Sequence, residues 1–138
     1  MRYNNILNRY TYMFKQLFKQ KPDVTKSNFE FKMRYAFDKR KNDSDNIKNK
    51  FPDKLPVIIE KLEATPVKDI DDHMYLVNKD INIGQILVII RQKLNIDPNK
   101  CVYVYLCNGV APSTSQTINE LYDKYSDKDG FLYIMYYA

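Results

Sequence analysis

The apolar residues nearest the amino terminus follow a helical repeat. Between Tyr3 and Phe18 they recur at intervals of three, four and seven residues, which places them along one side of a helix. Pro22 stands after this stretch and ends it. A second, shorter helical segment follows, and Ser27 or Asn28 is its expected N-cap.

A highly charged stretch occupies residues 37–51. Its only apolar residues are Phe37, Ile47 and Phe51, and Pro52 ends it. The wide spacing predicts a surface helix that touches the rest of the protein at few points.

The remainder of the chain switches between strand and helix patterns. The β-branched run at Val57–Ile59 predicts a first strand, and helical spacing at 83–94 predicts the main helix. Thr117 and Glu120 are spaced as a capping box that begins a short helix. Further strands are predicted at 74–77, at 101–106, after the Asn108-Gly109 turn and at 131–137. This order predicts an α+β fold, a ubiquitin-like β-grasp with amino-terminal helices packed on the sheet.

The last predicted strand, 131–137, is apolar or aromatic on both faces. Such a strand belongs in the middle of a sheet that is covered on both sides. The helix at 83–94 covers one face, and the amino-terminal helices are expected to cover the other.

Charge is distributed unevenly within the net value of +5. Residues 1–50 contain thirteen Lys/Arg against five Asp/Glu, whereas the remainder contains nine against twelve. A basic half indicates a solvated face, an acidic peptide partner, an anionic membrane or nucleic acid. At 138 residues the chain fits one domain, and no apolar run is long enough to span a bilayer.

Residue usage argues against an enzyme and against a metal site. His73 is the only histidine, so any nucleophile–histidine pair would have to use it. Cys101 and Cys107 fall in one predicted strand about 20 Å apart, too far to form a disulfide or to ligate one metal together. A reducing cytosol is therefore the expected setting. Asp38, Asp43 and Asp45 interrupt the basic run beside Phe37, so we expect no nucleic acid partner.

Three blocks of the sequence carry a family resemblance. "YAFDKRKNDSDNIKNKFPDKLPVIIEK", "YLVNKDINIGQILVIIRQKL" and "DKDGFLYIMYY" closely resemble the autophagy ubiquitin-like modifier family. That family includes autophagy-related protein eight, the GABA-receptor-associated proteins and the microtubule-associated light chains. The resemblance runs from about Phe29 to Ala138 and divides the chain into an extension, 1–26, and a modifier domain, 27–138.

The resemblance implies a non-enzymatic function without a cofactor. Family members bind aromatic-x-x-aliphatic motifs by adding the peptide as a strand to the edge of the second strand. They are also processed by a cysteine protease and joined through a C-terminal glycine to phosphatidylethanolamine by activating and conjugating enzymes. The implied location is the cytoplasm, and the autophagosomal membrane after lipidation.

The resemblance also implies two peptide pockets. Lys54 stands where the family places a basic residue that faces acids beside the motif. The aromatic pocket would be lined by Asp43, Ile47, Pro56, Ile58, Met74, Leu76 and Phe131, and the aliphatic pocket by Tyr75, Val77, Ile81, Ile86, Ile89 and Lys93.

This chain departs from the family pattern in four places. Ala138 falls about five residues before the position of the conjugated glycine, so conjugation of the chain as written is not expected. Met74 replaces a usual lysine, and Ile86 and Ile89 change the shape of the aliphatic pocket. The helix at Tyr3–Phe18 has no common counterpart; it covers apolar surface, contacts a membrane or partner, or occludes the pockets. The alternative function is therefore a non-conjugated peptide-binding adaptor whose amino-terminal helix contacts membrane or partner.

Overall fold

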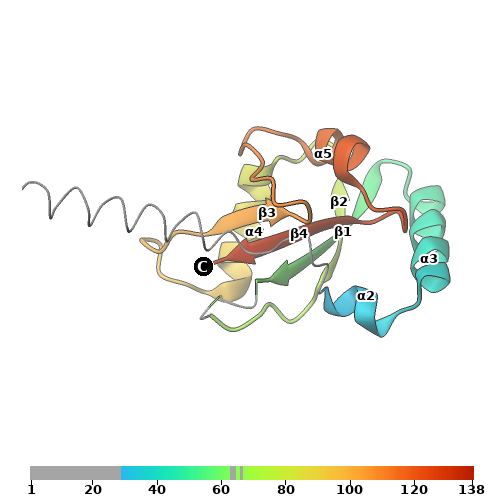
Figure 1. Cartoon of the computed structure of the whole chain (residues 1–138). Helices are drawn as coiled ribbons and strands as arrows, with labels where there is room; N and C mark the ends of the chain where they lie inside the picture. Colours follow the sequence, from blue (N-terminus) through green and yellow to red (C-terminus); the bar gives the residue numbers. More distant parts are fainter. Residues whose placement is uncertain (1–28, 63–64, 66) are drawn as a thin grey trace, which may run out of the picture.

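The computed structural model describes residues 29–62, 65 and 67–138 (Figure 1). The expected helix at Tyr3–Phe18, the cap at Ser27 or Asn28 and the extension 1–26 lie outside the described residues. In the described part the chain forms four helices and one sheet, in the order α2 (Glu30–Arg34), α3 (Phe37–Lys50), β1 (Lys54–Lys61), β2 (Met74–Asn78), α4 (Ile83–Leu94), β3 (Tyr103–Leu106), α5 (Ile118–Tyr125) and β4 (Leu132–Tyr137).

The four strands form one mixed sheet in the order β2-β1-β4-β3. β1 and β4 run parallel side by side in the centre, and β2 and β3 add to the two edges in antiparallel pairings (Figure 1). This arrangement confirms the predicted ubiquitin-like α+β fold.

Helix α4 packs on one face of the sheet. Its inward residues Ile83, Ile86 and Ile90 are fully buried among residues of all four strands, which form the larger of two core clusters. The helix begins with a capping box in which Asn82 and Gln85 satisfy each other's backbone N–H groups. The predicted helix at 83–94 is therefore confirmed to the residue.

A second, smaller core cluster covers the opposite face. It contains Phe29, Phe131 and Tyr133, and Phe31 of α2 packs against it. The ring of Phe29 lies edge-on to Tyr133, with ring centroids 4.7 Å apart. Successive side chains of β4 point to opposite faces, so they alternate between the two clusters. Five of the six residues of β4 are buried as a result. The prediction that the terminal strand lies inside a doubly covered sheet is thus confirmed.

Polar side chains attach helix α3 to the turn that precedes β4. Arg40 and Ser44 are its buried residues, whereas Phe37 is 45% exposed. Arg40 Nε lies 2.8 Å from Asp129 Oδ2, and Ser44 Oγ donates to the carbonyl oxygen of Asp129. The expectation of few contacts holds for the apolar residues, but the sequence pattern did not reveal that charged groups make the attachment.

Three local predictions need correction. The residues after the Asn108-Gly109 turn form no strand among the elements of the described chain, although Leu106 donates its N–H to the carbonyl of Val110. β3 begins at Tyr103 rather than at residue 101. The N-cap of α2 is Phe29, without a side-chain hydrogen bond, because the Glu60 carboxylate accepts the first two N–H groups of this helix instead.

Candidate functional site

Strand β2 is an edge of the sheet, so the backbone groups on its outer side have no strand beside them within the described residues. Its exposure pattern alternates, since Met74 and Leu76 are 49% and 39% exposed whereas Val77 is 7% exposed. An exposed edge with one solvent-facing row of side chains is able to pair with another chain.

Four of the residues predicted for the aromatic pocket share one face of β1 and β2. Pro56 stands opposite Leu76, and Ile58 stands opposite Met74, in the antiparallel register of the two strands. Ile58 and Phe131 belong to the smaller core cluster and are fully buried. They therefore form the floor of the site, and Met74 and Leu76 form its accessible surface.

Helix α3 provides the wall of this site. It packs against β1, the strand that carries Pro56 and Ile58. Asp43 and Ile47 lie one turn apart on α3 and are both partly exposed. Asp43 pairs with Lys39 at 3.0 Å. The ion pair is exposed and weak, so the Asp43 carboxylate remains able to meet a peptide.

Two residues predicted for the aliphatic pocket, Tyr75 and Val77, lie on the opposite face of β2, and Ile86 and Ile89 lie on α4. Val77 and Ile86 are buried in the larger core cluster, and Tyr75, Ile81 and Ile89 pack against it from partly exposed positions. All five predicted apolar residues therefore belong to, or pack against, the same cluster.

Two of the predicted residues are lysines. Lys93 is exposed and lines a cavity of about 260 Å³ with the segment 67–71 and the end of α4. Lys54 begins β1 and stands opposite Asn78, the last residue of β2. Of the two cations, Lys54 is therefore the one that the strand register places beside β2.

The hydroxyl of Tyr75 is the polar exception on the aliphatic face. It is buried and has no hydrogen-bond partner among the described residues. Burial raises the pKa of this phenol, and the nearby charge of Asp72 raises it further. A buried hydroxyl without a partner is an exception among folded proteins, and Tyr75 is that exception among the described residues of this face.

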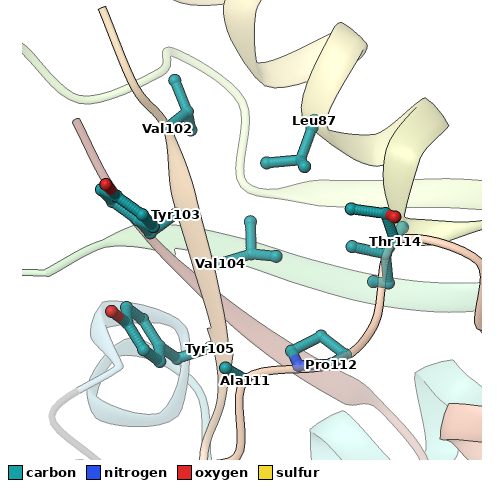
Figure 2. Close-up of a pocket in the computed structure, with 9 residues that line it drawn as sticks. Leu87, Val102, Tyr103, Val104, Tyr105, Ala111, Pro112 and Thr114 are labelled. Atoms are coloured by element: carbon teal, nitrogen blue, oxygen red, sulfur yellow. The ribbon is translucent and has the colours of Figure 1, made fainter.

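Another cavity lies at the opposite edge of the sheet and contains none of the predicted site residues. It measures about 170 Å³ and lies between α4, the β3 segment and the loop 111–114. Figure 2 shows Leu87, Val104 and Pro112 around it. The predicted peptide site lies instead along β2, at the other edge of the sheet.

The sequence pattern does not reveal the buried carboxylate that lies behind the predicted aromatic pocket. The carboxylate of Asp129 accepts hydrogen bonds from Arg40, from the hydroxyl of Tyr133 and from the backbone N–H of Phe131. Burial of the Tyr133 hydroxyl and its bond to Asp129 raise the pKa of Tyr133. These contacts join α3 to the strand that supplies Phe131. Because Arg40 and Asp129 are 89 residues apart, no local pattern connects them.

No helix among the described residues combines the length and the apolar character that crossing a bilayer would require. The described cysteines, Cys101 and Cys107, are both free thiols. This agrees with the expectation that they do not pair.

Comparisons with known proteins agree on one family. The family model described as "Autophagy protein Atg8 ubiquitin like" matches residues 39–138. Autophagy-related protein 8 of Mycosarcoma maydis is 37% identical over 106 residues, which cover 77% of this chain and 89% of that protein. Autophagy-related protein 8e of Arabidopsis thaliana is 40% identical over 106 residues, which cover 77% of this chain and 86% of that protein. The crystal structure of Trypanosoma brucei ATG8 superposes with a TM-score of 0.76 at 30% identity, covering 80% of this chain and 95% of the other.

Proposed function

The chain belongs to the Atg8 family of ubiquitin-like autophagy proteins, and from this premise we propose that it binds aromatic-x-x-aliphatic peptides along the outer edge of β2. One observation carries the proposal. Two residues predicted for the aromatic pocket, Met74 and Leu76, alternate along a single edge strand with two predicted for the aliphatic pocket, Tyr75 and Val77, and only the latter two pack in or against the core cluster that contains α4 residues.

The spacing of the motif fits this geometry. Successive side chains of an extended peptide point to opposite faces, so residues i and i+3 also point to opposite faces. A peptide that pairs with β2 therefore directs its aromatic residue toward Leu76 and its aliphatic residue toward Ile89, or the reverse. A motif with two intervening residues matches the two faces, whereas one with a single intervening residue does not.

The expected affinity follows from a short list of contacts. Burial of one aromatic and one aliphatic side chain contributes about 1.5–3 kcal/mol each. Backbone pairing along β2 and charge contacts add to this, for a total of about 8 kcal/mol, which corresponds to micromolar binding.

Charge is expected to adjust the affinity. Lys54 stands at the end of β2, where it is able to meet an acid beside the motif. Met74 takes a position where relatives in this family usually carry lysine, and its flexible thioether accommodates aromatic rings of different size. We therefore expect a weaker dependence on acidic flanks than a lysine would give.

The binding test uses the absence of tryptophan from the chain. A short acidic peptide with Trp-x-x-Leu is titrated with the protein, and the tryptophan fluorescence of the peptide is followed. Saturable micromolar binding supports the proposal. The matched control peptide has one residue fewer between Trp and Leu and should bind at least about tenfold more weakly, a loss of about 1.4 kcal/mol. Equal binding of both peptides, or of neither, contradicts the proposal.

The second part of the proposal is conjugation. In a form that carries a C-terminal glycine, the protein is a modifier joined to phosphatidylethanolamine by activating and conjugating enzymes, after a cysteine protease has exposed the glycine. It acts as a modifier rather than as a catalyst, in the cytoplasm and on the autophagosomal membrane. Membership of the Atg8 family supports this part.

Reconstitution tests the second part. A chain extended to a C-terminal glycine is incubated with the two enzymes, ATP and vesicles that contain phosphatidylethanolamine, and a glycine-to-alanine chain is the control. Formation of a lipid adduct by the glycine form alone supports conjugation. Retained peptide binding without an adduct supports the alternative, a non-conjugated adaptor.

A further inference from the structure

Three possible metal ligands meet where α2 lies against the sheet. Glu30 begins α2, Glu60 lies near the end of β1, and His73 immediately precedes β2. One ligand atom from each residue lies within 4.8 Å of the other two. The sequence predicts no such site, because these residues are far apart along the chain and only the β1–β2 pairing and the docking of α2 bring them together.

Glu60 is the fixed member of the group. Only 6% of its surface is exposed, and its two carboxylate oxygens accept hydrogen bonds from the backbone N–H groups of Glu30 at 2.7 Å and Phe31 at 3.1 Å. Each oxygen keeps a further lone pair for another partner. A buried carboxylate held in this way is able to bind a cation through its remaining lone pairs.

His73 is oriented in the manner of a metal ligand. Its Nε2 lies 3.0 Å from Asp69 Oδ2, and its side chain is 22% exposed. A carboxylate that holds one ring nitrogen leaves the other, Nδ1, with its lone pair available, and it fixes the orientation of the ring. The Tyr136 hydroxyl in turn donates a hydrogen bond to Asp69 Oδ1 at 2.6 Å.

Glu30 is the exposed member of the group. Its carboxylate forms an exposed ion pair with Arg34 at 2.5 Å, one helical turn away. Such a pair contributes little, so its loss opposes metal binding only weakly. Ligand atoms around a tetrahedral zinc lie about 3.4 Å apart, since each bond is about 2.1 Å long. Rotation of the exposed Glu30 side chain is able to bring its oxygen closer to the other two ligand atoms, and a small rotation of the His73 ring would do the same for Glu60 and His73.

We propose that Glu30, Glu60 and His73 bind a zinc ion, with water completing its coordination. One imidazole with two carboxylates suits zinc, whereas calcium and magnesium prefer sites made only of oxygen. The ion would link α2 to β1 and to the residue before the peptide-binding strand β2. This inference is independent of the proposed peptide binding.

Calorimetric titration of the full chain with zinc chloride, in a non-chelating buffer at neutral pH, tests the proposal. We expect one site with a dissociation constant of about 10 µM or tighter. His73→Gln and Glu30→Gln should each weaken binding at least about tenfold. Two controls should bind as the parent chain does: Asp71→Asn, which changes an exposed carboxylate outside the group, and the double variant Cys101→Ser/Cys107→Ser, which removes the described thiols.

A spectroscopic measurement on the unaltered chain makes the result independent of variant folding. His73 is the only histidine, so its ring nitrogens give one assignable pair of ¹⁵N resonances. A zinc-dependent shift of the Nδ1 resonance supports the site. An unshifted ring, no saturable binding, or binding that is lost in the cysteine variant but unaffected by His73→Gln would overturn it.

Discussion

Leu76 and Val77 are neighbours on β2, yet Leu76 is 39% exposed and Val77 is 7% exposed. They differ because successive residues of a strand point to opposite faces, and only the face of Val77 is covered by α4. One edge strand therefore offers two different surfaces to a peptide that pairs with it.

The first prediction concerns that surface. Leu76→Ala should weaken the Trp-x-x-Leu peptide about tenfold, because it removes apolar area that the aromatic residue covers. Val88→Ala on the outer side of α4 is the control, since Val88 is also accessible, at 52% exposure, but lies outside both predicted pockets. Fluorescence titration compares them. A second peptide, in which Ala replaces Trp, tests the contact itself. If Leu76 contacts the aromatic residue, Leu76→Ala should reduce the affinity for this second peptide much less than it reduces the affinity for the Trp peptide.

The second prediction concerns the attachment of α3. Arg40→Ala should lower the free energy of unfolding by about 3–5 kcal/mol, because it leaves the fully buried Asp129 carboxylate without its cation. Lys41→Ala is the neighbouring control; it breaks an exposed helical pair with Asp45 and should lower the free energy of unfolding far less than Arg40→Ala does. Urea unfolding measures both, and equal losses would contradict the assigned role of Arg40.

The third prediction concerns Gly130, whose φ of 87° is favourable for glycine alone. A Cβ at this position would lie 2.3 Å from Ser44 Oγ and 2.9 Å from Ser44 Cβ. Gly130→Ala should therefore destabilise the fold by more than Gly109→Ala, whose φ of 85° imposes the same backbone strain in a surface turn. The difference between the thermal unfolding temperatures of the two variants measures the clash with Ser44 of α3. Equal unfolding temperatures would show that Ser44 moves away without cost.

The fourth prediction concerns acid. Burial alone would raise the pKa of Asp127, but the hydrogen bond and charge of Lys32, 2.8 Å away, hold its pKa below the ordinary value of 3.8. A carboxyl whose pKa is lowered on folding stabilises the protein above that ordinary value and loses this contribution as the pH falls through the lowered pKa. The parent chain should therefore have a higher free energy of unfolding than Asp127→Asn at neutral pH, and this difference should shrink below about pH 3.8. Asp71→Asn, at a 91% exposed side chain, should show little difference at any pH.

The sequence by itself determined the elements and the family. Helix α4 could be predicted because the apolar spacing of 83–94 repeats with the helical period, and α5 because Thr117 and Glu120 form the predicted capping box. The doubly apolar strand at the carboxyl end predicted a covered central position, which β4 occupies. All of these depend on residues within one or two turns of each other, so the pattern alone contains them.

Tertiary structure decided which distant polar groups meet. In the sequence Arg40 belongs to a basic run, but in the structure it is buried against Asp129. Glu60 is a charged residue near a strand end in the sequence, but in the structure its carboxylate caps α2. The sequence places His73 in a loop, and only the register of β1 and β2 brings it near Glu60. A charged side chain carries no periodic mark of its partner, because the distance between two such groups depends on strand order and helix docking rather than on their separation along the chain.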